Sequence, residues 1–87
     1  MQKKILTVLN DRGAYSIKIV LANKTGRPDI IACYRGKFLA IEVKDKDGKL
    51  TPLQTYNLDK INKSGGFAIM VKDIESVNNL LNIIDRI

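Results

Sequence analysis

Apolar residues recur along this chain with two periods, which predict three helices and four strands. Ile5, Val8 and Leu9 at helical spacing predict a helix over residues 2–12, closed by Gly13 as a left-handed cap. The other expected elements are a strand over 15–20, a polar loop over 22–27, strands over 28–34 and 37–44 around Arg35-Gly36, a charged turn over 45–49, a helix from Pro52 to about residue 64, a strand over 67–71 and a last helix after Asp73.

The two later helices carry clear start signals. Thr51 is a predicted N-cap and Pro52 the first helical residue. Gln54, at the third helical position, completes a capping box with Thr51. Asp73 caps the last helix, whose apolar residues form one stripe: Ile74, Val77, Leu80, Leu81 and Ile84. The order α-β-β-β-α-β-α predicts a single α/β domain over residues 1–87. Three strands form an antiparallel meander, and a helical crossover leads to a fourth that can run parallel to one of them.

The composition narrows the chemistry. Fifteen Lys and Arg against nine Asp and Glu give a net charge of +6, which favours a polyanionic partner such as nucleic acid, although many small proteins are basic without one. The absence of histidine excludes Ser-His-Asp and Cys-His catalysis and His-ligated zinc. An enzyme of this composition would use carboxylates, lysines or a metal held by oxygen ligands.

The single cysteine, Cys33, excludes an intramolecular disulfide and suits a reducing, cytoplasmic setting. Because it lies in an apolar run, we expect it to be a small buried residue. The N-terminus does not resemble a signal peptide and no apolar run is long enough to cross a bilayer, so no membrane partner is expected. A chain of this size buries a modest share of its surface, and a homodimer would help to stabilise it.

Two carboxylates and a lysine interrupt the apolar pattern of the predicted hairpin. If Arg35-Gly36 is a two-residue turn, Tyr34 lies opposite Lys37 and Asp29 lies opposite Glu42, on one face of the sheet. Like charges placed opposite each other destabilise a sheet, and a divalent cation between them reverses that effect. Asp29, Glu42 and a main-chain carbonyl such as that of Val43 would form an oxygen site suited to Mg²⁺ or Mn²⁺. Lys44, on the same face as Glu42, would reach its rim.

Each of these residues also has an ordinary structural interpretation. Asp29 after a proline is a common turn or cap residue, and Glu42 and Lys44 can be the wet side of a half-exposed strand. Their joint arrangement favours a phosphodiesterase site.

The pattern Pro28-Asp29, then Glu42-Val43-Lys44, resembles the signature of PD-(D/E)XK nucleases. A longer pattern resembles the virus-type replication-repair nuclease (VRR-NUC) domain over about residues 2–72. It consists of G-x-P-D at 26–29, I-E-V-K at 41–44, GKLTPLQ at 48–54 and Gly65-Gly66 before an apolar strand.

This resemblance implies a restriction-endonuclease-like core, a mixed four-stranded sheet flanked by helices, and a metal-dependent DNA endonuclease. By analogy Asp29 and Glu42 bind the metal with the Val43 carbonyl, Lys44 assists the water nucleophile and Gln54 supports the site. Stand-alone members are typical of phages and mobile elements. They resemble four-way-junction resolvases, which act as symmetric dimers, so branched or Holliday-junction-like DNA and a homodimer are expected.

One position departs from the family pattern. The first helix usually supplies a further acid, whereas here Gln2 stands near the expected place and Asp11 lies only near the helix end. Gln2 can offer a neutral amide oxygen, so the site would carry one negative charge fewer. That change would weaken metal affinity or make a second metal dependent on substrate phosphate.

Basic residues around the hairpin are candidates for a nucleic-acid-binding rim, namely Arg27, Lys46, Lys49 and Lys60, together with Thr51. Exposed surface without a partner is the alternative for each. Tyr34 and Tyr56 are expected to pack rather than to stack on bases. Two other functions stay open: a basic nucleic-acid-binding module of the same fold without catalysis, and a protein-interaction subunit of a larger replication complex.

Overall fold

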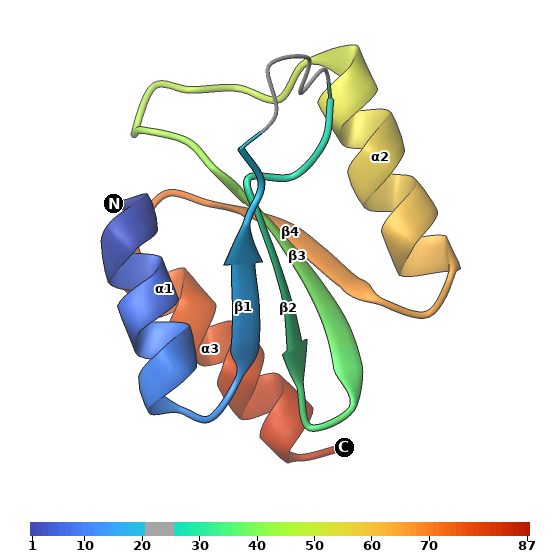
Figure 1. Cartoon of the computed structure of the whole chain (residues 1–87). Helices are drawn as coiled ribbons and strands as arrows, with labels where there is room; N and C mark the ends of the chain where they lie inside the picture. The colour runs from blue at the N-terminus through green and yellow to red at the C-terminus, as the bar shows by residue number, and fades with distance from the viewer. Residues whose placement is uncertain (21–25) are drawn as a thin grey trace.

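Four strands form one mixed sheet with helices on both faces in the computed structural model, which describes residues 1–20 and 26–87 (Figure 1). The elements are α1 (Gln2–Asp11), β1 (Tyr15–Lys18), β2 (Ile30–Tyr34), β3 (Lys37–Val43), α2 (Pro52–Lys63), β4 (Phe67–Val71) and α3 (Ile74–Asp85). The predicted order and α/β class are therefore confirmed. Most of the polar loop expected over 22–27 falls on residues 21–25, outside the described ranges.

The strand order is β1-β2-β3-β4, with β1, β2 and β3 antiparallel and β4 parallel to β3. The β2–β3 hairpin has the predicted two-residue turn. Arg35 and Gly36 both have positive φ (50° and 76°), as a type I′ turn requires, and Tyr34 pairs with Lys37. Helix α2 makes the crossover from β3 to β4.

The two faces of the sheet are covered unequally. Helices α1 and α3 pack on one face, where Ile5, Leu9 and Leu81 join Leu39 and Ile41 in the main core. Helix α2 covers the other face only over β3 and β4, where Leu58 packs on Ala40 and Ala68 (Figure 1).

The α2 side of β1 and β2 therefore stays open. Tyr15, Ile17 and Phe38 are exposed there, and they line an apolar groove with Ile31 and Cys33. The expectation that Cys33 is buried is wrong, because α2 does not extend over its side of β2.

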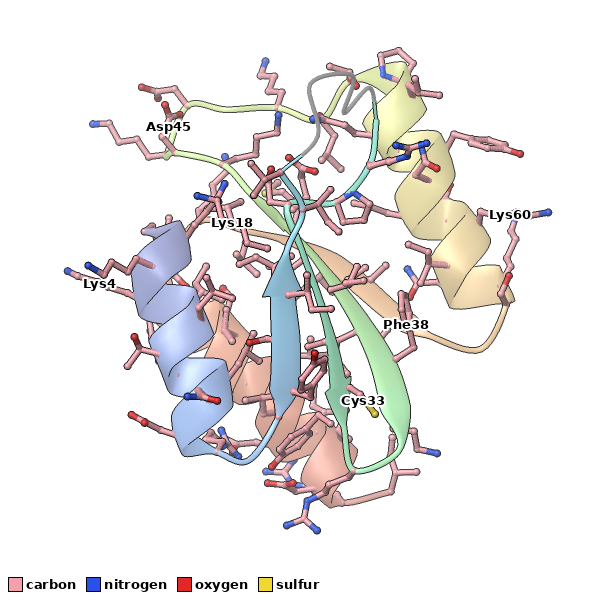
Figure 2. All side chains as sticks on the ribbon, viewed as in Figure 1. Lys4, Lys18, Cys33, Phe38, Asp45 and Lys60 are labelled. Atoms are coloured by element: carbon pink, nitrogen blue, oxygen red, sulfur yellow. The ribbon has the colours of Figure 1, made fainter. Side chains whose placement is uncertain are left out.

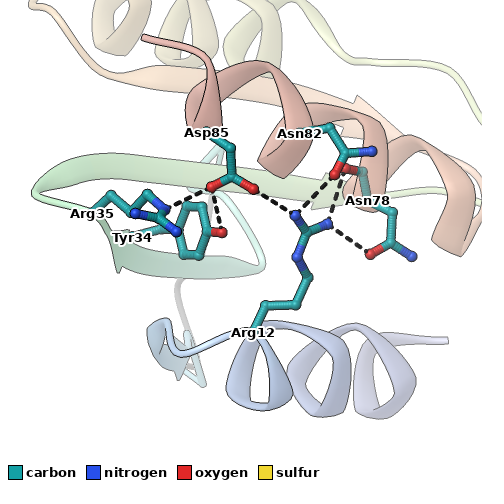
Figure 3. Close-up of polar contacts among 6 residues, drawn as sticks. All are labelled: Arg12, Tyr34, Arg35, Asn78, Asn82 and Asp85. Atoms are coloured by element: carbon teal, nitrogen blue, oxygen red, sulfur yellow. Dashed lines mark hydrogen bonds and ion pairs between the residues drawn. The ribbon is translucent and has the colours of Figure 1, made fainter.

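Asp85, the last residue of α3, ties three elements together at the hairpin end of the sheet (Figure 3). Its carboxylate accepts hydrogen bonds from the Tyr34 hydroxyl and Arg35 Nε, both at 2.7 Å, and from Arg12 at 2.9 Å. The hydrogen bond from Tyr34 has the largest effect on the pKa of Asp85 and lowers it. Burial raises that pKa by less, and the Arg35 hydrogen bond and the charges of Arg35 and Arg12 lower it further. The ring of Tyr34 is buried as predicted, whereas Tyr56 is exposed on α2.

None of the helices in the described ranges has the length and apolar character needed to span a bilayer.

Candidate active site

Asp29 lies just before β2, 5% exposed, where the chain leaves the regular ladder. Its N–H donates to the Ile41 carbonyl of β3 (3.1 Å), whereas its C=O accepts from the Ile19 amide beside β1 (2.8 Å). In a regular strand both groups of one residue point to the same neighbour, so the backbone twists at Asp29. The carboxylate then reaches β3, where Oδ2 accepts a hydrogen bond from the Val43 amide at 2.8 Å.

Glu42, near the end of β3, is 3% exposed and lies on the α2 side of the sheet. Its Oε2 is 3.3 Å from the side-chain amide nitrogen of Gln54 and 3.9 Å from Nζ of Lys44. Lys44 therefore projects on the same side as Glu42, as the strand period predicts, and its side chain keeps 20% exposure.

Gln54 has two partners, one at each end of its side-chain amide. Its Oε1 accepts from the Thr51 amide at 2.9 Å, and the Thr51 hydroxyl accepts from the Gln54 amide at 3.1 Å, which completes the predicted capping box. Its Nε2 is left to donate to Glu42. Gln54 thus caps the start of α2 and also donates a hydrogen bond to a carboxylate of the candidate site.

Two glycines let the chain pass close to these side chains. A Cβ on Gly26 would clash with Leu53 Cγ and would lie 2.8 Å from Asn57 Nδ2, and Gly26 has φ +72°. The first glycine of G-x-P-D thus allows the segment before Asp29 to lie against α2. A Cβ on Gly48 would lie 2.9 Å from Lys44 Cβ, so the turn after β3 packs on the lysine.

The predicted hairpin register is confirmed from Tyr34–Lys37 to Ile30–Ile41, where the ladder ends. Asp29 is the next residue, but its amide bonds to Ile41 instead of extending the ladder to Glu42. The two buried carboxylates are therefore brought to the same end of the hairpin through a twist, which the pairing rule alone does not describe.

The backbone of Val43 faces Asp29. The neighbouring amide of Lys44 donates to Val71 of β4, whereas the Val43 amide points the opposite way, to the Asp29 carboxylate. Because the N–H and C=O of one strand residue point to the same edge, the Val43 carbonyl also points to the β2 side.

Gln2 begins α1, at the end of the sheet where β2 starts and β3 stops (Figure 1). Its side-chain oxygen is buried without a hydrogen-bond partner among the described residues. Such an atom is costly, by about 1–3 kcal/mol, unless a ligand contacts it. Within the described ranges no three His, Cys, Asp or Glu side chains come together to hold a metal. The candidate donors are thus two carboxylates, the Val43 carbonyl and the Gln2 amide, all oxygens of the kind that Mg²⁺ and Mn²⁺ prefer.

The predicted basic rim is only partly assembled. Arg27 is exposed two residues before Asp29, and Lys46, Lys49 and Thr51 lie in and after the turn that follows β3. Lys60 lies on α2 about 9 Å along the helix axis from Gln54, on the side of the molecule away from Lys4 and Lys18 (Figure 2).

Two further lysines adjoin residues of the candidate site and were not predicted from the sequence: Lys3 follows Gln2 on α1, and Lys18 ends β1. Lys18 directly precedes Ile19, whose amide bonds to Asp29, and this pairing appears only in the folded chain.

Two solved structures share this architecture. A "VRR_NUC domain" superposes with a TM-score of 0.77 at 25% identity, covering 93% of this chain and 89% of that chain. The chain has a VRR-NUC nuclease-like fold. A "VRR_NUC domain protein" also matches, with a TM-score of 0.64 at 25% identity, covering 97% of this chain and 84% of that chain. No family model and no curated protein matches the sequence.

Proposed function

We propose that this chain is a Mg²⁺- or Mn²⁺-dependent DNA endonuclease. Branched or junction-like DNA is its proposed substrate, in the replication or repair of a phage or mobile element. The observation that carries the proposal is the meeting of Asp29, Glu42, Lys44 and Gln54 at one end of the sheet, in a fold similar to VRR-NUC domains.

The residues have separate tasks in this proposal. Asp29 and Glu42, with the Val43 carbonyl and the Gln2 amide, would hold the ion, which supplies Lewis-acid polarisation of the phosphodiester when bound. Lys44, beside Glu42, orients the attacking water and offsets charge on the phosphate. Gln54 fixes the orientation of Glu42 through its amide. Asp29 is fixed in turn by the Val43 amide.

The deciding experiment incubates labelled duplex, single-stranded, flap and four-way DNA with the wild type, in Mn²⁺ or in EDTA. Cleavage products that require Mn²⁺, and that disappear in Glu42→Gln, are expected. The control is Asp59→Asn, which also converts one carboxylate to an amide but lies on the exposed surface of α2. If Glu42→Gln cut DNA at the wild-type rate, the site assignment would be wrong.

A basic nucleic-acid-binding module without catalysis is the second candidate. It is favoured by the lack of a third acidic ligand among the described residues and by Gln2 at the start of α1. This function predicts salt-sensitive binding of the same DNA panel with no products in Mn²⁺.

We also propose a homodimer that uses the open α2 side of β1 and β2. Tyr15, Ile17 and Phe38 are 72%, 45% and 47% exposed on that side, and apolar patches of this kind mark contact sites. Ile17→Glu is expected to shift a dimer to monomer in sedimentation analysis. Val20→Glu, at an exposed residue that does not line this groove, is expected to leave it dimeric. A monomeric wild type would contradict the dimer.

A further inference from the structure

A second groove lies between α1 and β1, on the opposite side of β1 from the apolar groove. It has a volume of about 370 Å³ and is lined by Lys3, Leu6, Thr7, Asn10, Ser16 and Lys18. The lining has two cations and no acid, and neither lysine forms an ion pair with a described residue. The Thr7 hydroxyl donates to the Lys3 carbonyl, so the free donors are the lysines, the Asn10 amide and the Ser16 hydroxyl.

The backbone of β1 offers further donors at the open edge of the sheet, beside this groove. Strand β1 is at the edge of the sheet, with β2 as its only neighbour in the described chain. The amide of Ile19 points inward to Asp29. By the alternation of an antiparallel ladder, the amides of Ser16 and Lys18 point outward, to the open edge.

The groove starts beside the candidate site. Lys18 is adjacent to Ile19, which bonds to Asp29, and Lys3 is adjacent to Gln2 on α1. From Lys3 to Asn10 the groove follows α1 for about 10 Å. At a rise of about 3.4 Å per nucleotide along one strand, that length spans about three nucleotides.

We propose that this α1–β1 groove binds the sugar-phosphate backbone of DNA on one side of the Asp29–Glu42 site. The contacts are to phosphate oxygens, from lysine ammonium groups, the polar side chains and the edge amides, so they position the strand without reading its sequence. The inference rests on the proposed function in taking DNA as the ligand, but it concerns binding rather than cleavage. The alternative is that Lys18, on edge strand β1, serves only to prevent this strand from pairing with another chain. That role predicts no effect of Lys18 on DNA affinity.

The test measures binding of labelled duplex DNA by fluorescence anisotropy in EDTA, over a series of salt concentrations. Lys3→Gln and Lys18→Gln are each expected to lower the slope of log affinity against log salt by about 0.9, and the double variant by about twice that. Lys4→Gln is the matched control, since it removes the same charge from an exposed position of α1 but Lys4 does not line the groove. Its slope is expected to stay at the wild-type value.

The outcomes separate this inference from the nuclease proposal. Slopes for Lys3→Gln and Lys18→Gln equal to that of Lys4→Gln overturn the groove, even if the wild type cleaves DNA. Reduced slopes without cleavage in Mn²⁺ support the groove and overturn the nuclease. A change in oligomeric state with unchanged slopes also overturns the groove, because it makes the β1 edge a protein contact.

Discussion

The Val43 amide donates a hydrogen bond to the Asp29 carboxylate over 2.8 Å, joining the end of one strand to the start of its hairpin partner. The carboxylate is thereby part of the backbone structure as well as of the candidate site. Charge and hydrogen bonding at Asp29 can be separated by substitution.

Asp29→Asn removes the charge but keeps an oxygen that can accept from Val43. We expect it to abolish Mn²⁺-dependent cleavage with little change in the free energy of unfolding. Asp29→Ala also leaves the buried Val43 amide without its acceptor, so it should cost about 1–3 kcal/mol more in urea denaturation. Equal stability of the two variants would contradict a structural role for this hydrogen bond.

Gln54 combines helix capping with support of Glu42, and two variants divide these roles. Gln54→Glu keeps an acceptor for the Thr51 amide but places a negative charge 3.3 Å from the position of Glu42 Oε2. Cleavage should fall while the cap survives. Thr51→Ala removes the cap alone and should cost about 1 kcal/mol of helix stability, a loss that thermal unfolding detects. Full cleavage activity in Gln54→Glu would show that Glu42 does not need this donor.

Gly26→Ala is expected to be more damaging than Gly13→Ala. Both glycines have positive φ (+72° and +89°), so each substitution carries a backbone cost of about 1–2 kcal/mol. A Cβ at Gly13 meets nothing within 4 Å, whereas one at Gly26 clashes with Leu53. Only Gly26→Ala should therefore push the segment before Asp29 away from α2 and also reduce cleavage. Equal free energies of unfolding for the two variants would argue against the close approach.

The Asp85 cluster predicts a pH-dependent contribution to stability. The pKa of Asp85 is lowered in the folded chain, first by the Tyr34 hydroxyl. The contribution is therefore present above the unfolded pKa of about 3.9 and is lost as pH falls through the lower folded value. Asp85→Asn should lower the free energy of unfolding near neutral pH, and its difference from the wild type should shrink below about pH 4. Urea denaturation at the two pH values measures this, with exposed Asp59→Asn as the control. A difference that does not depend on pH would contradict an ionised Asp85 in the cluster.

The fold could be predicted because its signals are local. The capping box at Thr51, the two-residue turn at Arg35-Gly36 and the stripe of α3 depend on residues close in sequence, and all were confirmed. Exposure of Cys33 could not be predicted, because it depends on how far α2 extends over the sheet.

The elements that carry the candidate residues could be predicted from the sequence better than the geometry between those residues. The strand period placed Glu42 and Lys44 on one side of β3, and the capping box placed Gln54 at the start of α2, as the structure has them. The twist at Asp29 depends on simultaneous bonds to β1 and β3, which no local pattern contains. The lysines of the α1–β1 groove were missed for the same reason, since they come from different elements on the far side of β1.

The tight hairpin limits how relatives of this chain can vary in length. Asp29 and Glu42 are carried by the two arms of one hairpin, joined by a turn of only Arg35 and Gly36. One inserted residue in an arm would turn every later side chain to the opposite face, whereas one added to each arm would preserve the facing pattern. Insertions within the paired arms should therefore occur among functional homologues as one residue in each arm, which lengthens the spacing between the Pro-Asp and Glu-x-Lys motifs by two, and an odd change in that spacing should fall in the turn.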